Sequence, residues 1–432
     1  MEDSLLLARA QFGLNIGFHI LFPALTIALA WYLAAFRIAY ERTRDPRWLA
    51  TYTMWVKIFA LTFAVGVVTG VTMSFQFGTN WPGYMNHVGA IAGPLLSYEV
   101  LTAFFLEATF LGIMLFGGKR VPDWLHVLST ILVAIGTTLS AFWILALNSW
   151  MHTPTGQVLQ DGQWIAGDWM RVIFNPSFPW RFTHMMLASI LTGSFVLAGL
   201  SAWRLLKAND ELARRTLRIG LLTAAICVPV QVWVGDQHGL NTLEHQPAKI
   251  AAMEALWHTE SGMPLVLFAI PNEKERRNDY AVEVPYAGSL ILKHDPHGTV
   301  RGLDEFEPDR PPVGPLFFAF RAMVGIGLAM LAVSWIGAWA TRRGKVPPRW
   351  MLWGLSGFTF AGWAATLCGW VVTEVGRQPW LVTGLLRTKD AVGAASGAEL
   401  GASITSYAIT YSLLFFAYMV VLTHMAGKGA GE

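Results

Sequence analysis

Charged residues are scarce in this sequence. They make up 14% of its 432 residues, whereas soluble domains contain about a quarter. Hydrophobic residues reach 54%, and the chain contains 20 tryptophans and 26 phenylalanines. This composition excludes an ordinary soluble domain and predicts an integral membrane protein. The small net charge of +3 gives no reason to expect a nucleic-acid partner.

Cysteine is almost absent. Cys227 and Cys368 both fall inside apolar runs and share no metal-type spacing, which argues against an iron–sulfur or zinc site held by thiolates. We expect both to be small buried hydrophobic residues. The N-terminal segment also lacks a basic region before its first apolar run, and that run is too long for a cleaved signal peptide. It is expected to be a membrane span.

Apolar stretches predict an all-α, polytopic membrane protein. A helix needs about 20 apolar residues to cross a hydrocarbon core of ~30 Å. Nine stretches meet this length, at 14–38, 53–77, 91–117, 123–149, 180–206, 216–235, 314–341, 350–373 and 402–426. No internal repeat is visible.

Lysine and arginine gather after the odd-numbered spans, which predicts that those loops are cytoplasmic. The N-terminus is then outside and the C-terminus inside. The basic residues concerned are Arg37, Arg42, Arg44, Arg47, Lys119, Arg120, Arg204, Lys207, Arg214, Arg215, Arg218, Arg342, Arg343, Lys345 and Arg349.

One long polar segment, 236–313, interrupts the apolar pattern. It carries 13 of the chain's 28 acidic residues and ends in a proline-rich stretch. A loop of this length is usually functional or disordered. The sequence therefore divides into a six-helix part at 1–235, an outer loop at 236–313 and a three-helix part at 314–432.

Ionisable residues inside the spans are functional candidates, because a charged group at bilayer depth costs ~3 kcal/mol or more. Counting 1.5 Å per residue predicts that most of them share one layer near the outer face, with Glu107 deeper. The candidates, with one methionine at the same depth, are His19, Glu99, Glu107, His184, Arg321, Met323, Glu374 and Arg377.

Histidine, methionine and carboxylate side chains can ligate haem iron, and arginines can offset haem propionates. Each residue also has a simpler interpretation. His19 and His184 are as often hydrogen-bonded between helices, and Met323 alone is more often core filler. Glu99 and Glu107 could instead form the ion or proton path of a transporter or channel, which is the alternative function.

Six segments resemble subunit I of cytochrome bd-type quinol oxidases, and the resemblance extends along essentially the whole chain. The segments are GFHILFP (17–23), GVVTGVTMSFQFGTNW (66–81), FFLEATFLG (104–112), LSAFWILALNSWM (139–151), FRAMVGIG (320–327) and GWVVTEVGRQPW (369–380). The last is the most specific, because few unrelated helices end in this way.

The resemblance implies three haems. His184 and Met323 match the ligands of a low-spin haem b. His19 and Glu374 match axial ligands of two high-spin haems, one haem b and one haem d, and Glu99 matches an acid at the oxygen-reducing site. A further haem b in place of haem d stays open, as does the haem that each of these residues serves.

Further residues match positions around these haems and in a quinol-binding loop. Trp370 and Arg377 match residues packed around the high-spin pair, and Gln246, Lys249 and Glu254 have the family's spacing for quinol oxidation. Quinol oxidation needs a base, which a Lys249–Glu254 pair could supply. Without the resemblance, an exposed ion pair would be the simpler interpretation.

Oxygen reduction consumes protons, and Glu107 with Ser140 is a plausible relay for them from the cytoplasm. Segment 235–239 resembles the opening of the loop and places Asp236 there; His238 and His245 are interpreted as solvated loop residues. His126 has no assigned role.

The resemblance also implies partners. These are a second membrane subunit, small single-span subunits in some members, quinol, dioxygen and the lipid bilayer. The loop lacks a long insertion found in one branch of the family, so the chain is similar to the short-loop branch that includes cyanide-insensitive oxidases.

Overall fold

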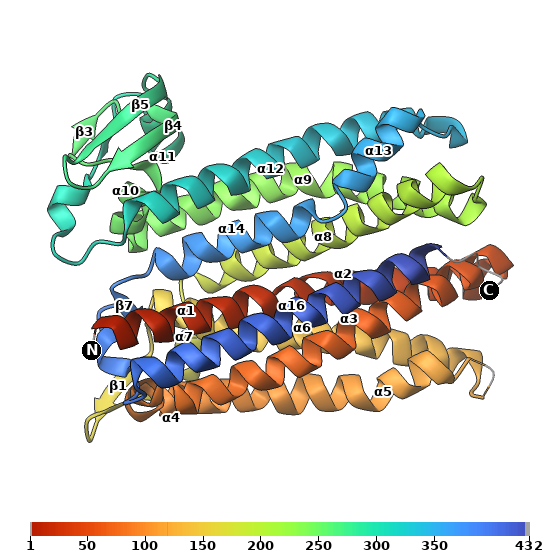
Figure 1. Cartoon of the computed structure of the whole chain (residues 1–432), viewed down its shortest axis with the longest axis horizontal. Coiled ribbons are helices and arrows are strands. Elements are labelled where there is room, and N and C mark those ends of the chain that lie inside the picture. Colours follow the sequence, from red (N-terminus) through yellow and green to blue (C-terminus); the bar gives the residue numbers. More distant parts are fainter. Residues whose placement is uncertain (1, 119, 428–432) are drawn as a thin grey trace.

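The computed structural model describes residues 2–118 and 120–427; Lys119, one of the basic residues used for the topology, lies outside them. Within that part, nine helices are long and apolar enough to cross a membrane, which confirms the predicted number. They form one elongated bundle, with the polar segment and the N-terminus at one end (Figure 1). The spans are Ser4–Thr43, Pro46–Thr79, Pro82–Phe116, Asp123–His152, Phe178–Lys207, Glu211–His245, Val313–Ala340, Arg349–Val375 and Gly397–Gly427.

Three of these spans are interrupted. The first consists of α1 (Glu2–His19) and α2 (Leu21–Thr43), and the eighth of α13 (Arg349–Gly357) and α14 (Ala361–Val375). In the third, α4 (Pro82–Tyr98) passes into a π-helical turn, η1 (Glu99–Phe104), before α5 (Phe105–Phe116). Such turns occur often at functional sites. His19 ends α1 and Glu99 begins η1, so two predicted site residues lie at these breaks.

The other spans are single helices. They are α3 (Pro46–Thr79), α6 (Asp123–His152), α8 (Phe178–Lys207), α9 (Glu211–His245), α12 (Val313–Ala340) and α16 (Gly397–Gly427). Short elements between spans are β1 (Gln157–Gln160), β2 (Gln163–Ala166), α7 (Trp169–Ile173), η3 (Arg342–Gly344), β7 (Trp380–Val382), β8 (Leu386–Arg387) and α15 (Thr388–Ala391). The strand pairs β1–β2 and β7–β8 are antiparallel.

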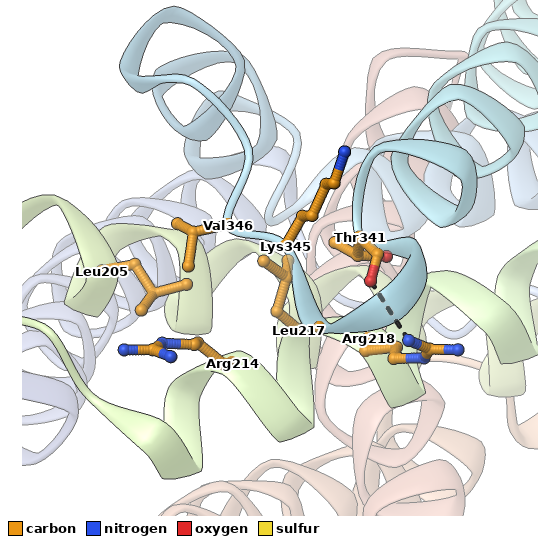
Figure 2. Close-up of a pocket in the computed structure, with 8 residues that line it drawn as sticks. Leu205, Arg214, Leu217, Arg218, Thr341, Lys345 and Val346 are labelled. Carbon is orange, nitrogen blue, oxygen red and sulfur yellow. Dashed lines mark hydrogen bonds between the residues drawn. The ribbon is translucent and has the colours of Figure 1, made fainter.

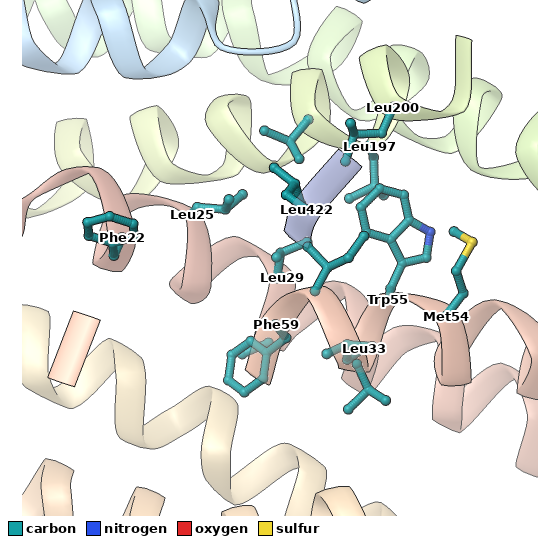
Figure 3. Packing of buried hydrophobic residues seen from close by; sticks show 14 of the residues in the cluster. Phe22, Leu25, Leu29, Leu33, Met54, Trp55, Phe59, Leu197, Leu200 and Leu422 are labelled. Atoms are coloured by element: carbon teal, nitrogen blue, oxygen red, sulfur yellow. The ribbon is translucent and has the colours of Figure 1, made fainter. Parts of the chain in front are cut away.

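The main hydrophobic core lies between α2, α3, α8 and α16. Phe22, Leu29, Trp55 and Phe59 are almost completely buried there, and Leu422 joins them from the last helix. Figure 3 shows these large side chains interdigitating between the helices.

The polar segment folds into a compact unit. Its elements are α10 (Pro247–Glu254), β3 (Glu260–Ser261), β4 (Leu265–Asn272), β5 (Arg277–Val284), α11 (Ala287–Lys293), β6 (Thr299–Val300) and η2 (Leu303–Phe306). Strands pair as β3–β6 and β4–β5, both antiparallel. Ile250, Met253 and Val266 form a buried cluster with Phe317 of α12 and Val372 of α14. The segment is therefore fixed to two spans by an apolar contact.

The boundary predicted for this segment is wrong by ten residues. Helix α9 continues to His245, so Asp236 and His238 lie in a helix and not in a loop. The segment GDQHGLNTLEH is too polar for hydropathy to distinguish the end of a helix from a loop, yet the helix persists because it packs against α8.

The opposite end of the bundle holds a small pocket lined by Leu205, Arg214, Leu217 and Val346, among others (Figure 2). Its volume is about 20 Å³, little more than one water molecule occupies. Arg218 donates a hydrogen bond to the Thr341 carbonyl at 3.2 Å beside it. A large ligand has no room there.

Candidate active site

His184 and Met323 lie within the group formed by α8, α9, α12 and α14. The His184 ring contacts α9 at Gly235, where a Cβ atom would lie 3.4 Å from a ring carbon. The Met323 sulfur contacts α14 at Gly369, where a Cβ would lie at 3.0 Å. His184 Nδ1 is buried and, among the described residues, has no hydrogen-bond partner. Because buried polar groups are normally paired, such a nitrogen fits a metal ligand.

The ring of His238 lies 5.5 Å from that of His184, measured between centroids. The interpretation of His238 as a solvated loop residue is therefore wrong. Its place on α9 puts it beside the candidate ligand.

His19 is oriented by a neighbouring hydroxyl. Its Nδ1 lies 2.9 Å from Thr69 Oγ1, and Thr69 donates its own proton to the Val65 carbonyl at 2.9 Å. Thr69 therefore accepts from Nδ1–H, which leaves the Nε2 lone pair available. A histidine that binds a metal through one ring nitrogen usually donates the N–H of the other nitrogen in such a hydrogen bond.

Glu374, in the last turn of α14, is held by two donors. Asn148 of α6 donates to it at 2.8 Å, and Arg377 does so at 2.5 Å. Arg377 is buried, and two of its nitrogens, Nε and Nη1, have no acceptor among the described residues. The Nε of buried Arg181 and the Nε1 of Trp370 also lack an acceptor among the described residues.

These unmatched N–H groups suit a bound group that carries carboxylates. Haem fits, because its propionates accept from arginine and its iron needs only one or two protein ligands. A bare metal ion fits less well, since the described residues contain no group of three His, Cys, Asp or Glu side chains arranged to hold one. The donor set present is therefore one for haem.

Glu99 and Glu107 both face α6. Ser140 donates to Glu99 at 3.3 Å, and a Cβ atom at Gly136 would lie 2.8 Å from Glu107. On α6, Asn148 contacts Glu374 and lies eight residues, about 12 Å, from Ser140, which contacts Glu99. Ser140 is only four residues, about 6 Å, from Gly136, which contacts Glu107. The predicted single layer is therefore wrong for Glu99, which lies at a depth closer to that of Glu107.

Lys249 is buried where α10 meets α6 and α14. Its Nζ lies 2.9 Å from Gln246 Oε1, 3.1 Å from His152 Nδ1 and 3.3 Å from the Thr373 carbonyl. Burial, and then the charges of Arg181 and Arg377, lower the pKa of Lys249 well below its usual value. A lysine in such a site can act as a base.

Glu254 and Lys249 are not an ion pair. Glu254 accepts from Arg321 of α12 at 2.7 Å. Arg321 also donates to the carbonyls of Val266, at 2.7 Å, and Met253, at 2.5 Å. Most of its donors are thus used within the polar segment, and these contacts give no support to the expected role of Arg321 beside a haem propionate.

Sequence reasoning missed Asn148, His152 and Arg181. Asn148 lies inside one of the family-like segments, and Arg181 precedes His184 by one helical turn, so both offered a signal. His152 directly follows the same segment as Asn148 but offered none, because its neighbours come from α10 and α14.

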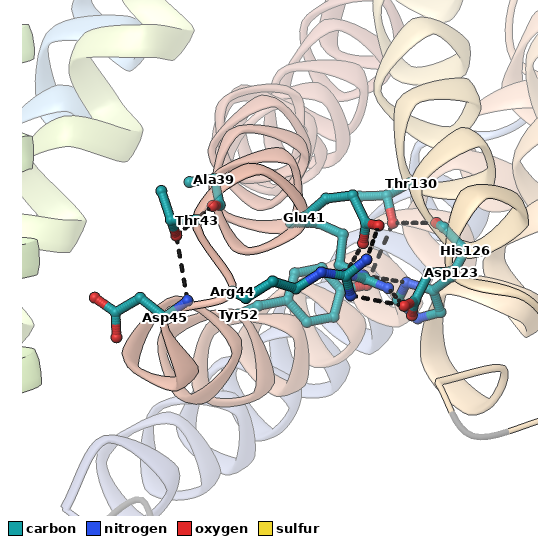
Figure 4. Close-up of polar contacts among 10 residues, drawn as sticks. Ala39, Glu41, Thr43, Arg44, Asp45, Tyr52, Asp123, His126 and Thr130 are labelled. Carbon is teal, nitrogen blue, oxygen red and sulfur yellow. Dashed lines mark hydrogen bonds and ion pairs between the residues drawn. The ribbon is translucent and has the colours of Figure 1, made fainter.

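His126 belongs to a structural network at the other end of α6. Its Nδ1 accepts from Arg37 at 3.0 Å, and Arg37 pairs with Asp123 at 2.7 Å and Glu41 at 3.3 Å. Figure 4 shows Glu41, Asp123 and His126 converging there. In this network, each acid has a cation beside it.

Known proteins resemble this chain along its whole length. The family model described as cytochrome bd terminal oxidase subunit I matches residues 7–430. The chain is 34% identical to the cytochrome bd ubiquinol oxidase subunit 1 of Bacillus subtilis, over 99% of this chain and 94% of that protein. It is 32% identical to the cytochrome bd-II ubiquinol oxidase subunit 1 of Escherichia coli, over 99% and 97%.

A solved structure, the bd oxidase from Geobacillus thermodenitrificans, matches with a TM-score of 0.91 at 32% identity, covering 98% of both chains. Nine candidate spans and respiratory relatives identify a multi-pass protein of the bacterial inner membrane. The alternative of a transporter or channel finds no match among these relatives. The chain belongs to the cytochrome bd terminal oxidase subunit I family.

Proposed function

We propose that this chain is the catalytic subunit of a quinol:oxygen oxidoreductase, which oxidises quinol and reduces dioxygen to water. The observation that carries the proposal is the junction of α10 with α14. There, Lys249 of the polar segment contacts the Thr373 carbonyl, one residue from Glu374, so the candidate quinol site and a candidate haem ligand share one buried cluster. Relatives named as ubiquinol oxidases support the same substrate class.

When bound, haem supplies the electron transfer and the oxygen chemistry. In the proposal, His184 and Met323 hold a low-spin haem b, as the unpaired His184 nitrogen supports. His19, Glu374 and Glu99 serve two high-spin haems, one haem b and the other haem d or a further haem b. Arg377 and Trp370 would donate their unmatched N–H groups to this pair.

The residues of the polar segment bind quinol and take its protons. Lys249, with its lowered pKa, is suited to accept a proton from a quinol hydroxyl. Gln246 offers its amide beside it and also donates to Thr383 at 3.4 Å. Glu254, tied to Arg321, completes the acid–base set from the other side of α10.

Glu107, Glu99 and Ser140 form the proposed proton route to the oxygen site. All three lie along the contact between the third span and α6, and Ser140 bridges to Glu99. The basic residues after the odd-numbered spans support a topology with the N-terminus outside and the C-terminus inside, and in the proposal this route starts on the cytoplasmic side. Proton release outside and uptake inside would build a gradient without a pump.

A second membrane subunit completes the proposed complex, as suits a family of multi-subunit oxidases, and small single-span subunits are further proposed partners. The three proposed parts are the six helices up to residue 245, the quinol segment from Gln246 to Pro312, and the last three spans. The short quinol segment agrees with the short-loop branch of the family.

The test uses the purified, detergent-solubilised complex. Its dithionite-reduced absorbance spectrum should contain haem bands, and reduced quinol should drive oxygen uptake at an oxygen electrode. Parallel assays with ubiquinol and menaquinol identify the preferred quinol. A preparation without haem bands, or one that consumes no oxygen with either quinol, contradicts the proposal.

A further inference from the structure

His152 ends α6 in the middle of the buried cluster that joins the polar segment to α14. Only 1% of its surface is exposed. Its Nδ1 lies 3.1 Å from Lys249 Nζ and 3.2 Å from Gln246 Oε1. On the far side of the ring, Nε2 lies 3.9 Å from Glu374 Oε1 and has no hydrogen-bond partner among the described residues. One imidazole therefore lies between the candidate quinol residues and a candidate haem ligand.

Lys249 has three polar neighbours, and they differ in stiffness. Gln246 directly precedes the same short helix, as its N-cap residue, and has a long side chain of its own. The Thr373 carbonyl is backbone but lies furthest from Nζ, at 3.3 Å. The His152 ring has only two rotatable bonds and projects from a 30-residue helix of the bundle. It is the rigid side-chain contact between the bundle and the lysine.

We propose that His152 is a positioning residue for quinol oxidation, whose Nδ1 holds the Lys249 side chain in place at the α6–α10–α14 junction. The inference rests on the proposed function and deepens it. The contact does not depend on one protonation state, because Nδ1 can accept from an ammonium or, as N–H, donate to a neutral amine. A lysine side chain left without it regains rotamer freedom, which binding of quinol must then remove.

Two substitutions separate the two sides of the ring. In His152→Asn, the amide oxygen or nitrogen occupies the place of Nδ1, so the contact with Lys249 is kept while the group facing Glu374 is lost. In His152→Gln, the amide lies one bond further out, near the place of Nε2, so the side facing Glu374 is kept and the Lys249 contact is lost. His152→Leu removes both.

We expect the quinol KM to rise roughly tenfold or more in His152→Gln and His152→Leu, since leaving a buried polar group without its hydrogen bond has a cost of that order. His152→Asn should stay within about threefold of the wild type, by the same reasoning. The value of kcat at saturating quinol should change less than KM. A purely structural role would not produce this order among variants of similar size.

The matched control is His126→Gln. It removes a second buried histidine of α6, one that contacts the Arg37 cation of α2. His126 and His152 are 26 residues apart, about 39 Å along α6, so the quinol KM should not change. Reduced spectra of all variants verify equal haem content before kinetics. If His152→Leu does not assemble, the comparison of Asn with Gln decides alone.

The inference is overturned if Asn raises KM as much as Gln, if neither does, or if kcat falls while KM stays constant. In each case an active wild type leaves the proposed function intact. A wild type that holds haem but never oxidises quinol overturns the proposed function and this inference with it.

Discussion

Two buried cations at the two ends of the bundle differ in their partners. Arg37 is 2% exposed and Lys249 3% exposed, so both lie out of water. Arg37 has two carboxylates beside it, Asp123 at 2.7 Å and Glu41 at 3.3 Å. Among the described residues, the hydrogen-bond partners of Lys249 are an amide, an imidazole and a backbone carbonyl, and none of them is a carboxylate.

The difference extends to the surrounding residues. Among the candidate haem-site residues, nitrogens of Arg181, His184, Trp370 and Arg377 are buried without a partner in the described part of the chain, whereas Arg37 donates to Asp123 and His126. Buried groups that are left unpaired cost free energy. The end that holds Lys249 therefore carries a cost that a bound ligand can offset, and the end that holds Arg37 has its buried cation paired within the protein. This contrast separates functional from structural polar clusters in one protein.

The largest expected effect comes from removing a candidate haem ligand at the end that holds Lys249. Met323→Leu keeps the volume but loses the sulfur, so the low-spin haem signal and quinol-driven oxygen uptake should fall roughly a hundredfold or more. Met330→Leu, one buried methionine further along α12, is the control and should behave like the wild type. Reduced-minus-oxidised spectra measure both. An unchanged spectrum in Met323→Leu refutes the assigned ligand.

The second effect concerns Lys249, the proposed base for quinol oxidation. Because its pKa is lowered, Lys249 should lose its proton well below the pH at which an ordinary lysine does, and the rate of quinol oxidation should rise with pH through that range. Lys249→Arg stays protonated, so the rise should vanish and kcat should fall by about a hundredfold. A pH profile of oxygen uptake checks this. A rise that survives in the variant shows that another group is the base.

Arg37→Gln tests the paired end. It should lower stability by about 2–3 kcal/mol, because two carboxylates and His126 lose a charged donor while the two acids remain partly solvated. The haem spectrum should not change. Arg377→Gln is the matched variant at the end that holds Lys249, and there we expect the spectrum to change more than the melting temperature. Thermal unfolding followed beside absorbance distinguishes them. The contrast fails if both variants shift the same observable.

The spans could be predicted from sequence because a membrane helix forms its backbone hydrogen bonds within itself and consists of a long apolar run. The end of α9 could not, since its last turns are polar and their helical state depends on packing against α8. The depth of Glu99 also failed, because residues were counted from span ends that lie at different depths.

The candidate ligands came from a resemblance, and the contacts among them came only from the structure. Lys249 and Glu254 were expected to act as a pair, although five residues on a helix place side chains about 140° apart. The structure separates them accordingly, with Glu254 on Arg321 and Lys249 on His152. His152 could not be found at all from sequence, because its role depends on two elements that are distant along the chain.

The smallest expected effect tests whether burial, and not pairing alone, distinguishes these networks. Arg47 and Glu211 form an ion pair at 2.8 Å near Arg37, but their side chains are 53% and 65% exposed. Solvent screens such a pair, so Glu211→Gln should cost less than about 1 kcal/mol and leave spectrum and activity unchanged. Thermal unfolding at low and high salt measures it. If this variant destabilised the protein as much as Arg37→Gln, charge pairing alone would explain the stability of the end that holds Arg37. The equal burial of Arg37 and Lys249 would then not be a basis for comparing them.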